Sequence, residues 1–140
     1  MTWFVYALLS AVFAAAVAIL GKIGVANVNS NLATAIRTVV ILLFAWGIVF
    51  AQGTFKEIGT IPKNTLVFLI LSGVATGLSW LFYFRALQLG NASQVAPIDK
   101  LSLVLTIIFA VIFLKEKISL SVLAGVALIS IGTLLVLLNK

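Results

Sequence analysis

The chain has 140 residues, of which 64% are hydrophobic and 9% charged, and its formal net charge is +6. A soluble fold of this size cannot bury so much apolar surface, so the composition predicts a protein whose solvent is a lipid bilayer. Without cysteine or histidine, and with three acidic residues in all, the chain offers no disulfide, no Cys–His or Ser–His catalytic pair and no set of metal ligands. We therefore expect no metal, no cofactor and no enzymatic activity.

Five apolar runs follow one another along the chain, each close to the roughly 20 residues that span a bilayer core. The runs are continuous rather than alternating, which favours helices, because lipid offers no partner to unpaired backbone groups. The predicted helices cover about residues 3–26, 32–51, 65–89, 93–114 and 120–138. The predicted fold class is therefore all-α, with five transmembrane helices. The first run lacks a positive leading segment and is too long for a signal peptide, so we expect it to be retained.

The nine cations are scattered singly near the ends of these runs, which disfavours nucleic-acid binding and favours contact with lipid headgroups. With five spans the termini lie on opposite sides of the membrane. The side of the N-terminus receives Lys56, Lys63, Lys115 and Lys117. The other side receives Lys22, Arg37, Arg85, Lys100 and Lys140. This near balance leaves two interpretations open: a cytoplasmic N-terminus, if the second group is held inside the protein, or insertion in both orientations.

Polar positions recur at helical spacing on the third and fourth predicted helices. On the third helix one face carries Ser72, Thr76, Ser79 and Tyr83, bordered by Trp80. On the fourth helix one face carries Asp99, Ser102 and Thr106. These residues are candidates for lining a substrate cavity, although a single Ser or Thr in a membrane helix often serves only helix packing. Packing is also the role predicted for Gly73, Gly77, Gly125 and Gly132.

Ionisable side chains at membrane depth are costly and tend to face a cavity or a partner. Asp99 is the only acid outside the loops, and Pro97 before it loosens the helix by removing a backbone donor. Neighbouring side chains on a helix diverge by about 100°, so Lys100 is not expected simply to neutralise Asp99. Asp99 is interpreted as a cavity group for a proton or cation, or as one half of an ion pair with Arg37, Lys22 or Lys100.

Two cations join the cavity candidates. Arg37 lies about two turns into the second predicted helix, and Lys22 lies near the end of the first. Either side chain could instead snorkel to the headgroups. Arg85 points away from the polar face of the third helix, so snorkelling or contact with another subunit is expected there. Together these groups predict a polar vestibule that suits a polar or anionic solute better than a bare cation.

A family resemblance covers nearly the whole chain. The stretch "YFRALQLGNASQVAPIDKLSLVLTIIFAVIFLKEKIS", followed by "LAGVALISIGTLLVLL", resembles the EamA domain of the drug/metabolite transporter superfamily, and "LATAIRTVVILLFAW" resembles its Arg-bearing second helix. The resemblance implies one five-helix domain over 1–140, secondary transport of small metabolites, and a cavity lined by helices one, three and four. Family members commonly carry two such units as an inverted repeat, and this chain has one.

The resemblance therefore implies half of a transport site, completed by a second copy inserted oppositely, by a related half, or by a parallel copy. The implied location is the plasma membrane of a prokaryote, with several passes through the bilayer. The alternative is a non-transporting accessory or assembly protein with the same fold. No phosphate-binding glycine loop is present, so coupling by ATP is excluded, while proton or cation exchange and facilitated diffusion both stay open.

Overall fold

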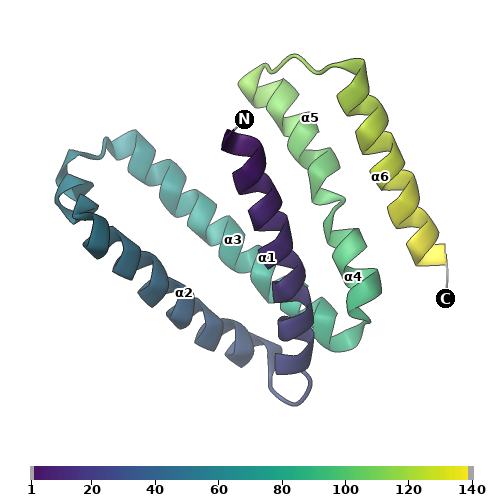
Figure 1. Cartoon of the computed structure of the whole chain (residues 1–140), viewed down its shortest axis with the longest axis horizontal. Helices are drawn as coiled ribbons and strands as arrows, with labels where there is room; N and C mark the ends of the chain where they lie inside the picture. The colour runs from purple at the N-terminus through teal and green to yellow at the C-terminus, as the bar shows by residue number, and fades with distance from the viewer. Residues whose placement is uncertain (1, 139–140) are drawn as a thin grey trace. The chain divides into compact units, whose positions relative to one another are not determined.

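The protein is described by a computed structural model over residues 2–138. Its elements, in chain order, are α1 (Thr2–Gly24), α2 (Ser30–Gln52), the 3-10 helix η1 (Thr54–Thr60), α3 (Lys63–Leu89), α4 (Ala92–Asp99), α5 (Ser102–Leu114) and α6 (Leu120–Leu138) (Figure 1). Five segments in the described part of the chain are long and apolar enough to cross a membrane, with α4 and α5 together forming the fourth. The predicted all-α fold with five transmembrane helices is confirmed.

Local sequence explains where α2 begins and ends. The Asn29 side chain accepts hydrogen bonds from the backbone N–H groups of Asn31 and Leu32, which satisfies two donors that the first turn leaves unpaired. Gly53 closes the other end in the left-handed region, with φ 73° and ψ 7°, and its N–H donates to carbonyls of the last turn. Between the second and third predicted helices, residues 54–60 form η1.

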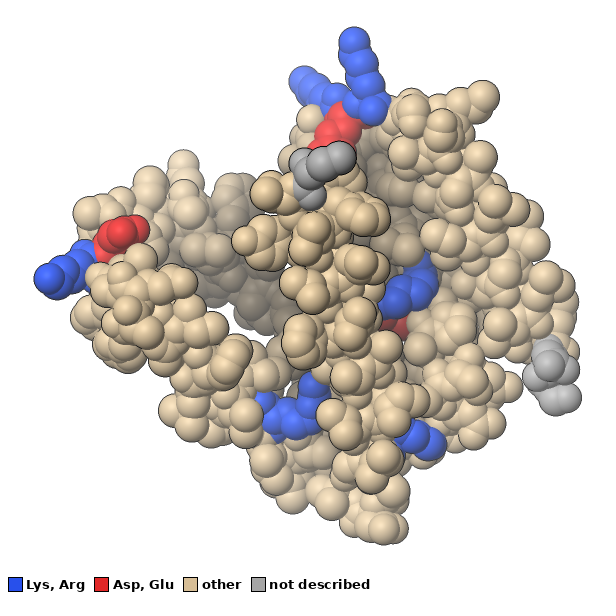
Figure 2. Space-filling model, in the orientation of Figure 1, with Lys and Arg blue, Asp and Glu red and all other residues tan. Residues whose placement is uncertain are grey.

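Most large apolar side chains on the spans face outward. Trp3, Phe82 and Phe113 are each more than 70% exposed, at 74%, 73% and 74%. Figure 2 shows one face of the molecule, where charged side chains occupy a few separate places on an otherwise uncharged surface. Such a surface is compatible with lipid as the surrounding medium rather than with water.

Backbone contacts divide the chain into two compact units, the first ending at Leu89 and the second beginning at Gly90. In the first unit both α1 and α2 pack on α3. The core of this unit is small, and Phe84 and Leu87 of α3 are almost completely buried in it. A Cβ atom added at Gly21 would lie 2.5 Å from Cε1 of Phe84, so α1 approaches α3 closely because residue 21 has no side chain.

In the second unit α6 packs against both α4 and α5. The α-helical hydrogen bonding is interrupted between α4 and α5, where Lys100 donates to the Pro97 carbonyl and Leu101 to the Ile98 carbonyl, both in the i→i+3 pattern. Pro97 lies inside α4, where it supplies no N–H to the helix. The predicted single fourth helix is therefore two helices that together form one span.

Candidate functional site

The first unit contains a cation within a membrane-spanning helix. Arg37, about two turns into α2, has its guanidinium carbon 3.9 Å from the centroid of the Phe84 ring and 5.9 Å from that of Trp80. A cation over an aromatic face is attracted by the ring quadrupole. Over residues 2–138 the guanidinium makes no hydrogen bond or ion pair, and its Nη1 atom is buried. Arg37 is thus held by aromatic rings and left without an acceptor in the described chain.

Arg37 also forms part of the wall of a cavity between α1 and α2. The cavity has a volume of about 420 Å³, within the range of small-molecule sites. The other lining residues, all of them uncharged and without polar side-chain groups, are Val17, Leu20, Gly21, Gly24, Val25, Val28, Ala33 and Ile36. Chemically, the arrangement is an apolar chamber with a single charged group at its wall.

Lys22, one of the predicted cavity residues, contacts the backbone of α3. Its Nζ atom donates a hydrogen bond of 2.7 Å to the carbonyl oxygen of Leu87, in the last turn of α3. Carbonyls of a last turn have no partner within their own helix, and the helix dipole favours a cation there. Lys22 therefore ties α1 to the end of α3 and, being half-buried, does not simply snorkel as the alternative interpretation had it.

Gln88 forms a second tie at the same end of the unit, and sequence reasoning did not single it out. Its Nε2 atom donates to the carbonyl oxygens of Val25 and Val28, at 3.0 and 2.8 Å, and its Oε1 accepts a hydrogen bond of 2.6 Å from Arg85. Arg85 was predicted to point away from the polar face of the third helix, and its side chain is exposed. One feature of the sequence could have indicated this role of Gln88. It is an amide side chain three residues after Arg85, at the end of an apolar run.

The predicted polar face of α3 separates into two parts. Trp80 and Tyr83 are half-buried, and Tyr83 meets the buried Phe84 edge to face at 5.5 Å, next to Arg37. Ser72, Thr76 and Ser79 are exposed, and the Thr76 hydroxyl donates to the Ser72 carbonyl of its own helix. The structure brings Arg37, Trp80 and Tyr83 together in one cluster. Ser72, Thr76 and Ser79 lie on the exposed surface of the helix.

The candidates of the second unit make local contacts. Asp99 forms an ion pair with Lys100 at 3.3 Å, with side chains 37% and 51% exposed. The expectation that Lys100 would not neutralise Asp99 is wrong, because α4 ends at Asp99 and the two side chains meet in the turn that follows. Thr106 donates to the carbonyl of Ser102 within α5, and both residues are exposed. The alternative interpretation of Asp99 as half of an ion pair is the one that fits this geometry.

The four glycines predicted to pack helices make no close contact within their own units. A Cβ atom added at Gly73, Gly77, Gly125 or Gly132 would meet no neighbouring atom within 4 Å. Close packing of this kind occurs instead at Gly21, where α1 crosses α3. The predicted packing role of the four glycines therefore stays a prediction, because spacing along a helix does not reveal which of its faces meets a neighbour.

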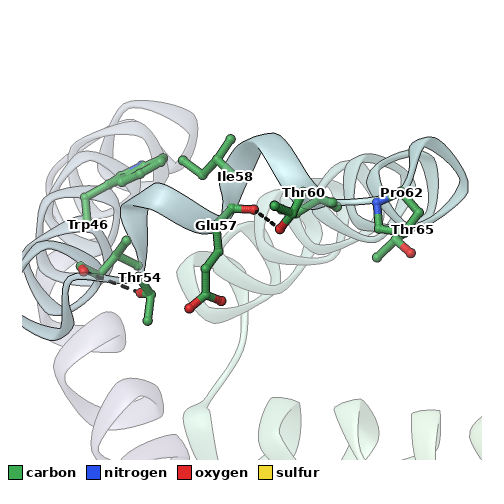
Figure 3. A pocket seen from close by; sticks show the side chains of 9 residues that line it. Trp46, Thr54, Glu57, Ile58, Thr60, Pro62 and Thr65 are labelled. Atoms are coloured by element: carbon green, nitrogen blue, oxygen red, sulfur yellow. Dashed lines mark hydrogen bonds between the residues drawn. The ribbon is translucent and has the colours of Figure 1, made fainter.

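A second cavity, of about 430 Å³, lies beside η1 and is lined by parts of α2, η1 and α3 (Figure 3). The Glu57 carboxylate extends from η1, while its backbone carbonyl accepts from the Thr60 hydroxyl. An aromatic group lies at the same end of α2, with Phe50 and Phe55 stacked at 5.2 Å and Trp46 tilted beside both. Aromatic groups at the end of a span are typical of membrane interfaces, so this region fits an anchor in the headgroup layer.

Comparisons with known proteins agree with the membrane architecture. The EamA-like transporter family matches residues 1–138. A protein of Sinorhizobium sp, named an uncharacterized transporter in the cobO 3' region, is 55% identical over 134 residues, which cover 96% of this chain and 95% of that protein. An uncharacterized protein of Methanocaldococcus jannaschii is 29% identical over 107 residues, covering 70% of this chain and 78% of that protein. No solved structure matches the chain. On the extent of the family match, the chain belongs to the EamA-like transporter family, a family of multi-pass integral membrane proteins.

Proposed function

We propose that this chain is a subunit of a secondary transporter for small metabolites in the plasma membrane of a prokaryote. We further propose that it works with a second five-helix unit, either an oppositely inserted copy or a related half. Membership of a transporter family over residues 1–138 supports the first statement. The second is supported by the general architecture of transporters built from inverted repeats, whose sites lie at the interface between repeats.

The single observation that carries the proposal is the environment of Arg37. A charged side chain at the centre of a membrane helix costs about 2.5–3.5 kcal/mol or more, so it normally has a partner or faces water. Here the charge lies at the wall of a cavity, over the rings of Phe84 and Trp80, with no acceptor in the described chain. Of the predicted cavity residues, we retain Arg37 with Trp80 and Tyr83 as the cluster proposed to face the solute.

The proposal is tested by flux from the purified protein. The chain is reconstituted into liposomes without other proteins, and uptake of a panel of radiolabelled metabolites is compared with uptake into empty liposomes. We expect uptake of at least one solute that depends on the protein. If a stable membrane partner co-purifies, the two proteins are reconstituted together. The accessory role replaces the transporter role if no solute enters either with the chain alone or with the chain and its partner.

The arrangement of the two units is tested separately. A tag on the C-terminus is labelled from outside intact cells and again after permeabilisation. Labelling of part of the population from outside supports copies inserted in both orientations. Labelling from one side alone contradicts an antiparallel homodimer and supports a related half or a parallel dimer, which cross-linking of the purified protein then distinguishes.

A further inference from the structure

We propose that the cavity between α1 and α2 binds a small organic anion, with an oxyanion group such as a carboxylate paired to Arg37 and an apolar body in the chamber. This inference rests on the proposed function in one respect, namely that this ligand is the transported solute. It names the chemical class of that solute, which neither the family nor its relatives specify.

The walls of the cavity determine the apolar part of the ligand. Eight of the nine lining residues carry only hydrocarbon side chains or none, and Arg37 is the ninth. A chamber of about 420 Å³ accepts a body of the size of an aromatic ring with room to spare. A strongly polar body such as a sugar would lose its hydration there without gaining hydrogen bonds from the lining side chains.

The anionic part of the ligand follows from Arg37. A guanidinium carries five N–H donors in a planar fork that matches a carboxylate or phosphate, and in the described chain none of the five has an acceptor. The rings of Phe84 and Trp80 hold the group in place, which lowers the entropy lost when it pairs. An organic cation would be repelled, because no acid is among the lining residues. A neutral ligand would leave the charge unpaired.

The ends of the cavity are fixed by contacts that do not involve Arg37. Lys22 and Gln88 bind backbone carbonyls of α3 and of the connection after α1, and they hold the ends of α1 and α3 together. Neither side chain is among the residues that line the cavity. The contacts that hold α1 against α3 therefore do not use the lining group that would pair with the anion.

Binding is tested with benzoate as the probe, against its neutral isostere benzamide and the cation benzylammonium. The full chain is placed in nanodiscs of zwitterionic lipid, and binding is measured by calorimetry. We expect benzoate to bind about tenfold or more tightly than benzamide, which is the ratio that one charge-assisted hydrogen bond provides. We expect benzylammonium not to bind. Equal binding of benzoate and benzamide overturns the proposal.

Two variants of Arg37 test the role of the guanidinium. Arg37→Gln should abolish the preference for benzoate, and Arg37→Lys, which keeps the charge but loses the planar fork, should retain part of it. The control is Lys56→Gln, which removes a cation that is exposed on η1 and lies outside the lining set. The control variant should bind benzoate with an affinity within about twofold of the unchanged protein. This change is well below the tenfold difference expected between benzoate and benzamide, which corresponds to about 1.4 kcal/mol. Retained preference in Arg37→Gln contradicts the inference.

A second pair of variants tests the chamber without touching the charge. Gly24 lines the cavity, and a Cβ atom added there meets no atom within 4 Å, so Gly24→Leu should fill the chamber without a clash at Cβ. We expect it to block benzoate binding. Gly47→Leu on α2, where an added Cβ also meets nothing within 4 Å, adds the same side chain outside the lining set and should leave binding unchanged. Normal benzoate binding by Gly24→Leu places the ligand elsewhere and overturns the proposal.

An anionic lipid is the rival occupant, and the nanodiscs distinguish it. If replacing the zwitterionic lipid by phosphatidylglycerol abolishes benzoate binding at constant ionic strength, the site belongs to a lipid headgroup and the proposal fails. Unchanged binding supports a soluble anion.

The two proposals can also fail separately: flux of a solute without benzoate binding overturns this inference alone. Benzoate binding that requires Arg37, without flux of any solute from the chain alone or together with a co-purifying partner, supports the anion site and overturns the transporter role.

Discussion

The charged side chains discussed above make different kinds of contact in the two units of the chain. In the first unit Lys22 binds a carbonyl oxygen of another helix, and Arg37 lies over the rings of α3. In the second unit Asp99 pairs with its neighbour in sequence, Lys100, at a place where both side chains are more than one third exposed. The first unit uses charge in contacts between helices, whereas the Asp99–Lys100 ion pair of the second unit is local.

The difference separates charges that hold the fold from charges that do not. A hydrogen bond from an ammonium group to a half-buried carbonyl contributes more than an exposed ion pair, which gains little and loses side-chain entropy. The second unit instead relies on the buried Thr133, whose hydroxyl is 3.2 Å from the Pro97 carbonyl and 2.9 Å from that of Ile129. We therefore expect substitutions to be costlier in the first unit, in the order given below.

The largest effect is expected at Phe84, which is 1% exposed and lies against both Gly21 and Arg37. Phe84→Ala should lower the free energy of unfolding by about 3 kcal/mol, because the lost contacts leave a cavity between three helices. Unfolding in mixed detergent micelles, followed by circular dichroism, measures the change. Phe82→Ala, on the same helix and 73% exposed, is the control and should change the stability little. Equal losses in the two variants would show that α3 is not the centre of the first unit.

The second prediction compares two lysines. Lys22→Met should cost about 1.5–3 kcal/mol, since it removes a charge-assisted hydrogen bond and leaves the Leu87 carbonyl without that donor. Lys100→Met should cost at most about 1 kcal/mol, because its ion pair is exposed. The same unfolding assay measures both. A larger loss at Lys100 would reverse the comparison between the units.

A smaller effect is expected at Thr133, which ties α6 to α4 in the second unit. Thr133→Val keeps the shape of the side chain and removes the hydroxyl, and it should cost about 0.6 kcal/mol, the average for hydrogen bonds between membrane helices. Thr76→Val is the matched control, because its hydroxyl is exposed and bonds only within α3. If the two variants lose the same stability, the contact between α6 and α4 contributes nothing beyond the local bond.

The smallest change in stability is expected for Asp99→Asn, about 0–0.5 kcal/mol, because an exposed pair contributes little. Solute flux through the Asp99→Asn variant in liposomes is the more informative measurement. Unchanged flux is expected if Asp99 serves only the pair with Lys100. A loss of flux at unchanged stability would restore Asp99 as a cavity group and move the functional emphasis toward the second unit.

The sequence by itself determined the medium, the number of spans and most helix ends. Span length and hydropathy are local properties, so lipid forces each apolar run into a helix wherever it lies. Pro97 acts within its own helix, and the sequence showed it as a point where the fourth span is weakened. The motif from Tyr83 onward also identified the family, which the match over residues 1–138 confirms.

Only the tertiary structure decided which faces meet. In a membrane helix the positions that face lipid and those that face another helix are both apolar, so periodicity does not separate them. Phe84 therefore looked like any other apolar residue of α3, although it lies against α1 and α2. In the same way, whether Lys22 reached the headgroups or the Leu87 carbonyl depended on where α1 crosses α3, a distance fixed by the missing side chain at Gly21.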